Sequence, residues 1–348
     1  MIYFDNAATS PLLPNLKTEQ IFNPSSPHTL GIQAERELDN ARKIISDTIG
    51  CEPSNLIFTS GGTESNNLAI LGFVMANKRN PITIMAKPWE HPSILQPIKF
   101  AEEYFPYVTA HISDSFLSTT GTSLVCTSQV NHETGDMPEI VKPENSVLLI
   151  DGCQGFSKHF INFKEADMYT FSGHKCNAPT GVGGLAKKPN IRLAPLLHGG
   201  GQEKNLRSGT ENLDGIIKLS RALKNTSEEI TYIKEEIASL SNLLPNTFIN
   251  SMEPKTSPYI LNMSFLGIKG ETLVHALSEK GIYVSMGAAC RSRKKVKSAL
   301  ELMGFPLNRA ESAIRFSFSV LNTLEEAKTA TPIIIETVNR LRRILGGS

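Results

Sequence analysis

Short apolar segments that each end in polar residues recur through the first two-thirds of this chain. The apolar runs are residues 55–60, 82–86, 123–130, 146–151 and 167–172. Segments with helical apolar spacing, 31–49 and 68–78, lie among them. Buried parallel strands are almost continuously apolar, and the residues that follow them gather at one edge of the sheet. The alternation therefore predicts an α/β fold with a mostly parallel, doubly wound sheet.

The pattern changes near residue 244. A polar helix over about 225–243 leads into a Pro- and Ser-rich connection, 244–258, and shorter helical and extended segments follow. We therefore expect a large domain formed by residues 13–243. Residues 1–12 and 244–348 are expected to form a smaller α+β domain.

The overall composition predicts a cytoplasmic protein of ordinary globular type. The chain has 35 basic and 34 acidic residues, so no net field favours nucleic acid. No apolar run approaches the roughly 20 residues of a membrane-spanning helix, and the first residues do not resemble a secretory signal. The five cysteines are scattered without a CxxC pair, which argues against a disulfide framework or a zinc site.

The segment SGHKCNAPTGVGG, residues 172–184, carries the strongest chemical signal. Lysine is seldom buried without a task, and desolvation lowers its pKa so that it can form a Schiff base with an aldehyde. Lys175 lies just after an expected buried strand, and Ser172 and His174 beside it could donate to a phosphate. Taken alone, the segment equally fits a surface loop with a solvated lysine.

Asp151 ends the apolar run SVLLID, where a carboxylate needs a partner. Pyridoxal phosphate requires such a carboxylate, which keeps its ring nitrogen protonated and makes the ring an electron sink. An aspartate that caps a turn is the simpler alternative. The separation of Asp151 from Lys175 leaves room for a further strand, so both side chains can face one cofactor.

Gly61, Gly62 and Thr63 lie between an expected strand and an expected helix. Glycines there let backbone amides approach a phosphate, which the helix N-terminus favours, and Thr63 can cap the helix or donate its hydroxyl. A plain capped helix start explains Thr63 but not the glycine pair.

Two further segments are candidates for the same site. His91 follows the run 82–86 and could stack on a pyridine ring or transfer protons, although a turn residue is the simpler reading. The loop HGGGQEKNLRSGTEN, residues 198–212, offers glycines, Arg207 and Thr210, and fits a phosphate contact or a surface loop.

Cys290 follows three small residues and precedes the basic run 291–297. The small residues predict an accessible loop, and nearby positive charge lowers a thiol pKa from its ordinary value of about 8.5. A cysteine ahead of a solvated basic helix face is the alternative. Cys153 and Cys176 adjoin the candidate cofactor residues and are rival thiols, which we interpret as small packing residues.

Arg315 lies inside the apolar run SAIRFSFS. A buried guanidinium needs a carboxylate, and its rigid fork suits the α-carboxylate of an amino acid. An internal salt bridge is the alternative.

These motifs, in this order, resemble the class V aminotransferase superfamily and, within it, the NifS/IscS-like cysteine desulfurases. The resemblance spans nearly the whole chain and rests on DNAATSP (5–11), NPSSPH (23–28), GGTESNN (61–67), EHPSIL (90–95), NHETG (131–135), DGCQG (151–155), SGHK (172–175), HGGG and RSGT (198–210), GAAC (287–290) and IRFS (314–317).

The resemblance implies a pyridoxal 5'-phosphate enzyme of fold type I that forms a homodimer. It implies that Lys175 holds the cofactor and that Cys290 takes sulfur from L-cysteine, leaving L-alanine. The resulting persulfide would pass to an acceptor protein for iron–sulfur cluster assembly or tRNA thiolation.

The same resemblance implies roles for the other motif residues. His91 would stack on the pyridine ring, Asp151 would contact its nitrogen, Gln154 and His132 its phenolic oxygen, and Gly62, Thr63, Ser172, His174 and the partner subunit's Thr210 its phosphate. The substrate would contact Arg315 and Asn131. No metal ligand set is implied.

The chain departs from the family pattern at His132, where the family has asparagine, and in the basic residues after Cys290. Other class V enzymes, such as aminotransferases or selenocysteine lyases, share the cofactor residues, and the GAAC segment favours sulfur transfer. A degenerate cofactor protein that serves as a binding partner in sulfur assembly is the alternative of a different class.

Overall fold

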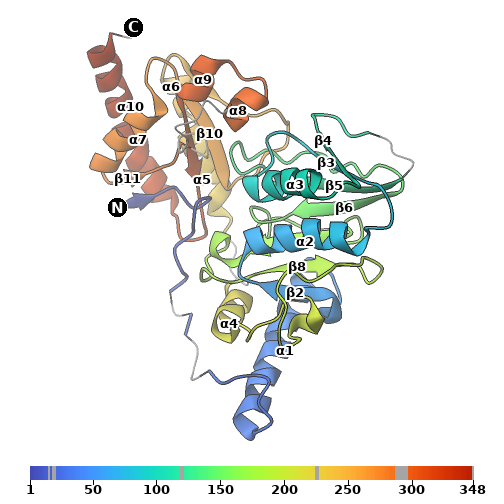
Figure 1. Ribbon diagram of the computed structural model, residues 1–348. Helices are drawn as coiled ribbons and strands as arrows, with labels where there is room; N and C mark the ends of the chain where they lie inside the picture. Colours follow the sequence, from blue (N-terminus) through green and yellow to red (C-terminus); the bar gives the residue numbers. More distant parts are fainter. Residues whose placement is uncertain (15, 18–20, 118–120, 224–226, 287–296, 347–348) are drawn as a thin grey trace. The chain divides into compact units, whose positions relative to one another are not determined.

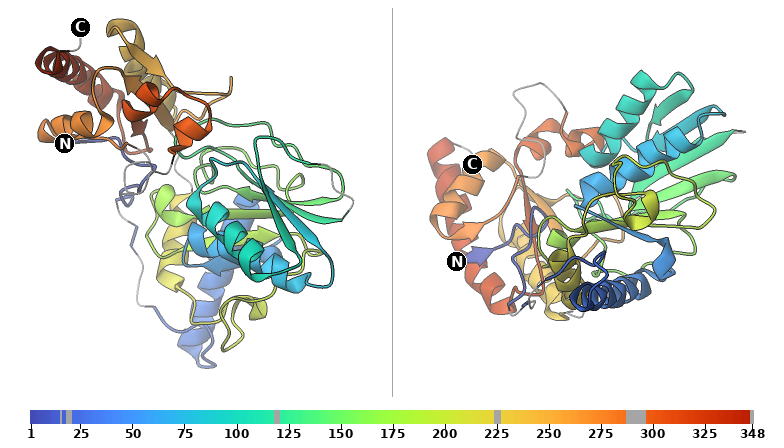
Figure 2. Two further views of the ribbon diagram at one scale, coloured as in Figure 1. Left: turned by 45° about the horizontal axis from the view of Figure 1, so that its top comes forward. Right: turned by 60° about the horizontal axis from the view of Figure 1, so that its bottom comes forward.

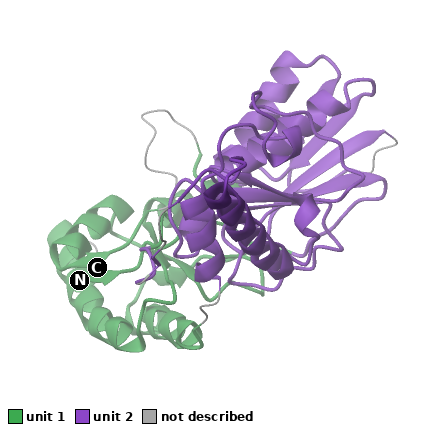
Figure 3. Ribbon diagram, turned by 90° about the horizontal axis from the view of Figure 1, so that it is seen from below, with its two compact units in different colours: residues 1–10, 130–138, 225–348 green, residues 11–129, 139–224 purple. Residues whose placement is uncertain are grey.

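The structure is a computed structural model that describes residues 1–14, 16–17, 21–117, 121–223, 227–286 and 297–346. These residues form two compact units (Figure 3). Unit 1 comprises residues 1–10, 130–138 and 225–348, and unit 2 comprises residues 11–129 and 139–224. The boundaries differ from the expected domains in three places: residues 130–138 belong to unit 1, residues 225–243 belong to unit 1, and residues 11–12 belong to unit 2. Residues 225–243 belong to unit 1 because Ile230, Ile233 and Ile237 are buried in its core.

Unit 2 is built on a sheet of seven described strands in the order β2-β8-β7-β6-β5-β3-β4 (Figure 1). Their bounds are β2 Leu56–Thr59, β3 Ile82–Ala86, β4 Val108–Ile112, β5 Thr122–Ser128, β6 Ser146–Asp151, β7 Met168–Ser172 and β8 Gly183–Lys187. Neighbours from β7 to β4 pair in parallel, whereas β8 is antiparallel to both β7 and β2. The mostly parallel sheet agrees with the predicted α/β fold.

Side chains cap the N-termini of three of the four described helices of unit 2, through His28, His91 and Asn212. The helices are α1 Thr29–Ile49, α2 Gly62–Ala76, α3 Pro92–Tyr104 and α4 Leu213–Ala222, with short 3-10 turns η1 Pro53–Asn55, η2 Gly173–Lys175 and η3 Glu203–Asn205. Gly50 ends α1 in the left-handed conformation that glycine tolerates best. Helices α2 and α3 pack side by side along the sheet (Figure 1 and Figure 2). Their apolar side chains and those of the strands form one core, which fixes the strand ends that carry the polar residues.

Unit 1 contains an antiparallel sheet in the order β12-β10-β9 and the parallel pair β1-β11. Its strands are β1 Ile2–Tyr3, β9 Thr247–Ile249, β10 Ile260–Phe265, β11 Ile282–Tyr283 and β12 Ala313–Ser317. Its helices are α5 Glu229–Ala238, α6 Leu240–Leu243, α7 Gly270–Glu279, α8 Ala299–Leu302, α9 Leu307–Glu311 and α10 Leu324–Leu345. A capping box formed by Thr323 and Glu326 begins α10. Helices α5, α7 and α10 pack on the antiparallel sheet around a shared apolar core.

Two local expectations differ from the structure. The expected helix over about 225–243 is two helices, α5 and α6, that meet at Ser239. The expected connection 244–258 contains the short strand β9, whose residues pair with β10. No helix among the described residues has the length and hydropathy needed to cross a membrane.

Candidate active site

Asp151 is the last residue of β6 and the centre of a buried polar cluster in unit 2. Asp151 is 5% exposed, so each of its carboxylate oxygens needs a donor. The backbone N–H of Cys153 donates to Oδ1 over 2.9 Å, and the side-chain amide of Asn66, on α2, donates to Oδ2 over 2.9 Å. Thr170, on the neighbouring strand β7, donates to the other end of the same amide, Oδ1 of Asn66, over 2.6 Å. The fold thus holds a carboxylate in a fixed orientation at the carboxyl end of the parallel strands.

His91 belongs to the same cluster through Ser93. His91 is the N-cap residue of α3, and its Nδ1 accepts the backbone N–H of Ser93 over 3.1 Å. The hydroxyl of Ser93 lies 2.8 Å from the same Nδ1 and 2.9 Å from Nδ2 of Asn66. Burial and the positive charge of Lys175 lower the pKa of His91, while Asp151 opposes them. His91 also lines a cavity of about 530 Å³ alongside residues of α2 and α3.

Gly61 and Gly62 form the N-terminus of α2 beside Ser172. A Cβ added at Gly62 would lie 2.3 Å from Sγ of Cys153, and one at Gly61 would lie 3.6 Å from Oγ of Ser172. The hydroxyl of Ser172 is buried and has no hydrogen-bond partner among the described residues. Backbone amides at a helix start and an unpartnered hydroxyl beside them are what a phosphate binds. Thr63 is exposed at the same end of α2.

We expect Gly62→Ala to weaken cofactor binding about tenfold, which corresponds to ~1.4 kcal/mol. The added methyl group would collide with the buried thiol of Cys153 and displace the start of α2. The measurement is a titration of cofactor-free protein with pyridoxal phosphate. The double variant Gly62→Ala with Cys153→Ala removes the colliding sulfur and should recover most of the affinity. Equal loss in the single and double variants would refute this packing argument.

Lys175 is the last residue of η2, directly after strand β7, and is partly buried. The positive charge of Lys175 lowers the pKa values of both His91 and His174. Burial, with the charges of Lys175 and Lys158, lowers the pKa of His174 to about 4. His174 is therefore neutral at physiological pH and can act as a hydrogen-bond donor without adding a second charge beside Lys175. Gln154, three residues after Asp151 in the sequence, is also buried.

Glu90 is a buried carboxyl group next to this cluster that sequence analysis did not identify. It accepts the backbone N–H of Ser128 over 3.2 Å, and its other oxygen makes a short hydrogen bond with the Ser128 hydroxyl. Ser128 is the β5 neighbour of Asp151 in the sheet. Burial raises the pKa of Glu90 to about 7, Asp151 adds to the rise, and the hydrogen bonds from Ser128 and the charge of Lys87 oppose it.

We expect Glu90→Gln to stabilise the fold increasingly as the pH rises from about 4.5 to about 7. Because the folded pKa of Glu90 lies above its ordinary value of 4.5, the folded state binds more protons than the unfolded state in this window. Wild-type stability from this group is thus lost with rising pH, by at most about 1.4 kcal/mol per pH unit. Urea unfolding of both proteins between pH 4.5 and 8 measures the difference, with the exposed Glu103→Gln as control. A difference that does not change with pH would refute the assignment.

The loop after β8 contains a further buried carboxylate, Glu203. Its oxygens receive the guanidinium of Arg42 over 2.5 Å and 3.0 Å and the backbone N–H of Phe58 over 2.9 Å. Thr210, further along this loop, is exposed. The ion pair ties the loop to α1, and the hydrogen bond from Phe58 ties it to β2. Thr210 lines a pocket with Thr59 and Ser60, which directly precede the Gly61–Gly62 pair.

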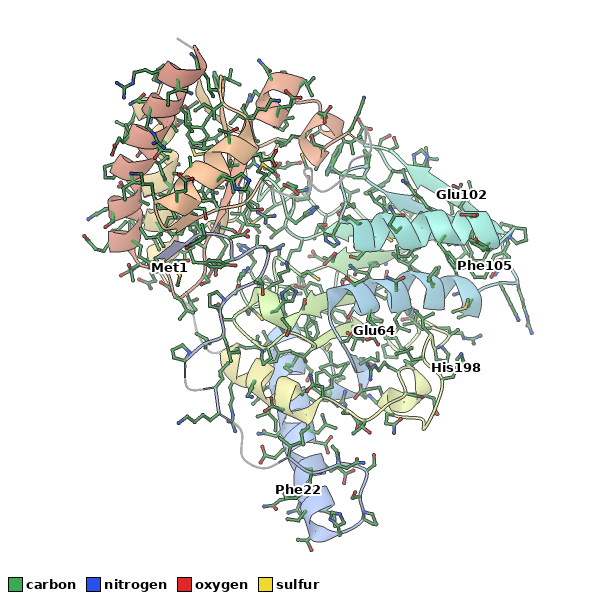
Figure 4. All side chains as sticks on the ribbon, turned by 60° about the vertical axis from the view of Figure 1, so that its left-hand side comes forward. Met1, Phe22, Glu64, Glu102, Phe105 and His198 are labelled. Carbon is green, nitrogen blue, oxygen red and sulfur yellow. The ribbon has the colours of Figure 1, made fainter. Side chains whose placement is uncertain are left out.

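Glu64, labelled in Figure 4, joins the same loop to the start of α2. It accepts the backbone N–H of Ser60 over 2.8 Å and pairs with Nε of Arg207 over 2.9 Å. Burial raises the pKa of Glu64, but the hydrogen bonds from Arg207 and Ser60 lower it by more, so the pKa of Glu64 lies below its ordinary value. An anionic Glu64 in the first turn also suits the helix dipole.

Arg315 lies on β12 in unit 1 and is 5% exposed. Its Nη1 donates to the backbone carbonyl of His132 over 2.7 Å, and its Nη2 lies 3.2 Å from Oδ1 of Asp5. Its Nε is buried without a hydrogen-bond partner among the described residues. The guanidinium therefore keeps one buried donor for a further acceptor. The alternative internal salt bridge is present, with Asp5, and the expected role toward a substrate carboxylate stays a prediction.

Asn131 and His132 are also in unit 1, in the turn that precedes Gly135. Oδ1 of Asn131 accepts the backbone N–H groups of Glu133 and Thr134 over 2.8 Å and 3.0 Å, so only its amide nitrogen is left for a ligand. Nε2 of His132 lies 3.6 Å from a carboxylate oxygen of Glu133.

The four described cysteines carry no disulfide. Burial raises the pKa of Cys51 to about 12 and that of Cys176 to about 11, and raises the pKa values of Cys126 and Cys153 well above their ordinary range. These thiols are therefore protonated at neutral pH, and Cys126 and Cys176 are buried. Cys290 lies outside the described residues. Among the residues that are described, no group of three or more His, Cys, Asp or Glu side chains could hold a metal ion.

The fold of unit 2, with lysine, histidine and carboxylate side chains at the strand ends, is typical of an α/β enzyme. The sequence pattern of the family described as aminotransferase class-V matches residues 2–329. A NifS/IcsS protein homolog of Lactobacillus delbrueckii subsp. bulgaricus is 36% identical, over 94% of each chain. The putative cysteine desulfurase IscS 1 of Bacillus subtilis is 32% identical, over 98% of this chain and 99% of the relative.

A solved structure described as a NifS-like protein superposes with a TM-score of 0.85 at 28% identity, over 99% of each chain. The chain therefore belongs to the class V aminotransferase family and, within it, to the NifS/IscS-like cysteine desulfurases.

Proposed function

We propose that this protein is a pyridoxal-phosphate-dependent cysteine desulfurase that converts L-cysteine to L-alanine. One observation carries the proposal: the buried Asp151 carboxylate, oriented by Asn66, lies in one electrostatic cluster with His91 and Lys175. A buried carboxylate, a neutral imidazole and a partly buried lysine at strand ends form the set of groups that this cofactor requires. Membership of a family whose relatives are named cysteine desulfurases supports the same reaction.

The residues of unit 2 fit the cofactor. The unpartnered Ser172 hydroxyl and the Gly61–Gly62 backbone would hold its phosphate, together with Thr63 and His174. Asp151 would hold a proton at the ring nitrogen, and Lys175 would hold the cofactor covalently through Nζ. When bound, pyridoxal phosphate supplies an electron sink for bonds at the substrate α-carbon.

Each remaining side chain would bind, orient or move a proton. Gln154 and His132 would contact the cofactor oxygen, and Thr210 of the partner subunit would complete the phosphate site. Arg315 would bind the α-carboxylate of L-cysteine through its unpartnered Nε, assisted by Asn131. Once released from the cofactor, Lys175 would take the α-proton, and His91 would move protons between substrate and solvent.

Sulfur transfer would occur at Cys290. Its thiolate forms an S–S bond with the substrate sulfur while the substrate Cβ–S bond breaks. The bonding electron pair stays with carbon, and a proton then completes L-alanine. The product on the enzyme is a persulfide at Cys290, which an acceptor thiol would receive for iron–sulfur cluster assembly or tRNA thiolation.

We further propose that the protein works as a homodimer in the cytoplasm. The resemblance to the cysteine desulfurases implies this dimer, and the exposed position of Thr210 leaves it accessible to a second subunit. The four described cysteines are all free, which supports a reducing compartment. Light scattering of the cofactor-loaded protein would measure the oligomeric state, and a monomer that retains full activity would refute the dimer.

The decisive experiment gives cofactor-loaded protein L-cysteine and a reductant and quantifies alanine and sulfide, beside the Cys290→Ala variant. We expect equal amounts of both products from the wild type and none from the variant, which should still bind the cofactor. Cys153→Ala is the matched control and should retain turnover, since burial keeps that thiol protonated.

Loss of activity in Cys153→Ala instead of Cys290→Ala would move the acceptor role to the buried thiol. No product from a cofactor-loaded wild type would favour another class V substrate, or a role as a binding partner in sulfur assembly.

A further inference from the structure

The ring of His91 serves as the cap of helix α3, and this contact determines where its proton lies. The backbone N–H of Ser93 points at Nδ1 over 3.1 Å, and a backbone N–H can only donate. Nδ1 must therefore present its lone pair, so a neutral His91 carries its proton on Nε2. A proton on Nδ1 would break the cap and leave two donors facing each other.

The donor directions in the surrounding network lead to the same conclusion independently. An ionised Asp151 can only accept, so the group of Asn66 that lies 2.9 Å from it must be the amide nitrogen. In this orientation the hydroxyl of Thr170 donates to Oδ1 of Asn66 over 2.6 Å. The second hydrogen of this nitrogen is directed at the Ser93 hydroxyl over 2.9 Å. Because that hydroxyl already receives one hydrogen, its own is free for Nδ1 of His91, 2.8 Å away.

We infer that Asn66 and Ser93 are positioning residues that hold His91 as the neutral tautomer with its proton on Nε2 and link its ring to Asp151. Donation runs in one direction, from Asn66 to both Asp151 and Ser93, and from Ser93 to His91. The two charged groups that reach the ring, Asp151 from β6 and Lys175 from η2, act in opposite directions on its protonation.

This arrangement deepens the proposed function, on which its catalytic consequence rests. Nδ1 is occupied by two donors from Ser93, so every proton that His91 gives or takes during the reaction must pass through Nε2. The same contacts fix the plane of the ring, because Nδ1 is held at the first turn of α3. A histidine that stacks on a cofactor ring needs a fixed plane of this kind.

The inference can be tested by nitrogen NMR of protein labelled with ¹⁵N in its histidine rings, with pyridoxal phosphate bound. The chain has eight histidines, and the His91→Gln variant identifies the signals of His91. Between pH 7 and 8.5 we expect Nε2 of His91 to be protonated, and Nδ1 to be an unprotonated nitrogen that accepts hydrogen bonds. In Ser93→Ala the Nδ1 signal should move toward that of a weakly bonded nitrogen.

Kinetics of the same variants separate positioning from general damage. We expect Ser93→Ala and Asn66→Ala to lower kcat about tenfold, with little change in KM. This decrease in kcat is smaller than the decrease that a complete loss of acid–base catalysis causes. Asn77→Ala is the matched control: it removes the same side chain from the C-terminal end of α2, where it bonds only to the carbonyl of Phe73. Its His91 signals and its kcat should stay at wild-type values.

Two results would overturn the inference: a proton on Nδ1 of His91 in the wild type, or His91 signals that are unchanged in both Ser93→Ala and Asn66→Ala. If one variant does not fold, the other decides. If Nε2 carries the proton in a cofactor-loaded protein that does not desulfurise cysteine, the positioning role is supported and the proposed function is what fails.

Discussion

The Lys175→Ala variant should lose at least about 10³-fold of the cysteine-dependent alanine production. Alanine has no amine to hold the cofactor covalently or to take the α-proton, so both functions proposed for Lys175 should disappear together. The variant should also lack the visible absorbance of a lysine-bound pyridoxal phosphate, and we expect it to bind the cofactor reversibly through the proposed phosphate site at Gly61–Gly62 and Ser172. Absorbance spectra and alanine quantification measure the two effects.

The neighbouring Lys158 provides the control for charge. Its charge, like that of Lys175, lowers the pKa of His174. Lys158→Ala should therefore change the local field without removing turnover or the cofactor absorbance. Lys175→Ala with turnover within tenfold of wild type, or Lys158→Ala with the larger loss, would contradict the assignment of Lys175.

The Asp151→Asn variant should lose about 10²-fold or more of its turnover. A neutral amide cannot hold a proton at the cofactor ring nitrogen as a carboxylate does. The substitution also turns one of two acceptors into a donor, so either the backbone N–H of Cys153 or the amide of Asn66 loses its partner. Turnover and the pH dependence of the cofactor absorbance should therefore change together.

Asp167→Asn serves as the control for damage to a buried carboxylate. Asp167 pairs with Lys142 and Lys188 at the start of β7, away from the cluster around Asp151. This variant should lose stability in urea and keep its kcat. Asp151→Asn with turnover within threefold of wild type would show that the carboxylate is not needed at the ring.

The strand-end residues of unit 2 could be predicted because the signal is local. Asp151 and Ser172 each end an apolar run, and the structure places both at the ends of parallel strands. The same pattern predicts Lys175 and the Gly61–Gly62 pair, which come just after the ends of apolar runs. The pattern indicates that polar groups lie at one edge of a sheet. Because β6 and β7 pair in parallel, Asp151 and Ser172 lie at the same edge.

The supporting residues could not be predicted in the same way. Asn66 and Asn67 are adjacent in α2, and only the fold buries the first against Asp151 while the second bonds to the carbonyl of Thr63. Glu90 next to His91 gives no signal of burial in the sequence. Strand β8 was missed because its glycines have low strand propensity, whereas in the structure Gly183 lies against the backbone of Gly61, where a Cβ would not fit.

The domain boundary depends on contacts that a sequence pattern does not contain. Residues 229–238 are an amphipathic helix under either division of the chain. Their apolar face packs against β10 and α10. Helix α10 begins only at Leu324, far along the chain from these residues. Such long-range packing is a property of the tertiary structure, and helical periodicity carries no information about it.

The protonated state of the four described cysteines has a practical consequence for chemical work on this protein. Alkylating reagents react with thiolates, and burial suppresses the thiolate form of Cys51, Cys126, Cys153 and Cys176 at neutral pH. A thiol-directed probe should therefore label these four cysteines slowly at neutral pH. Under the proposed role of Cys290, sulfur loading there should appear as a change in the labelling of the unaltered chain, without engineering any other position.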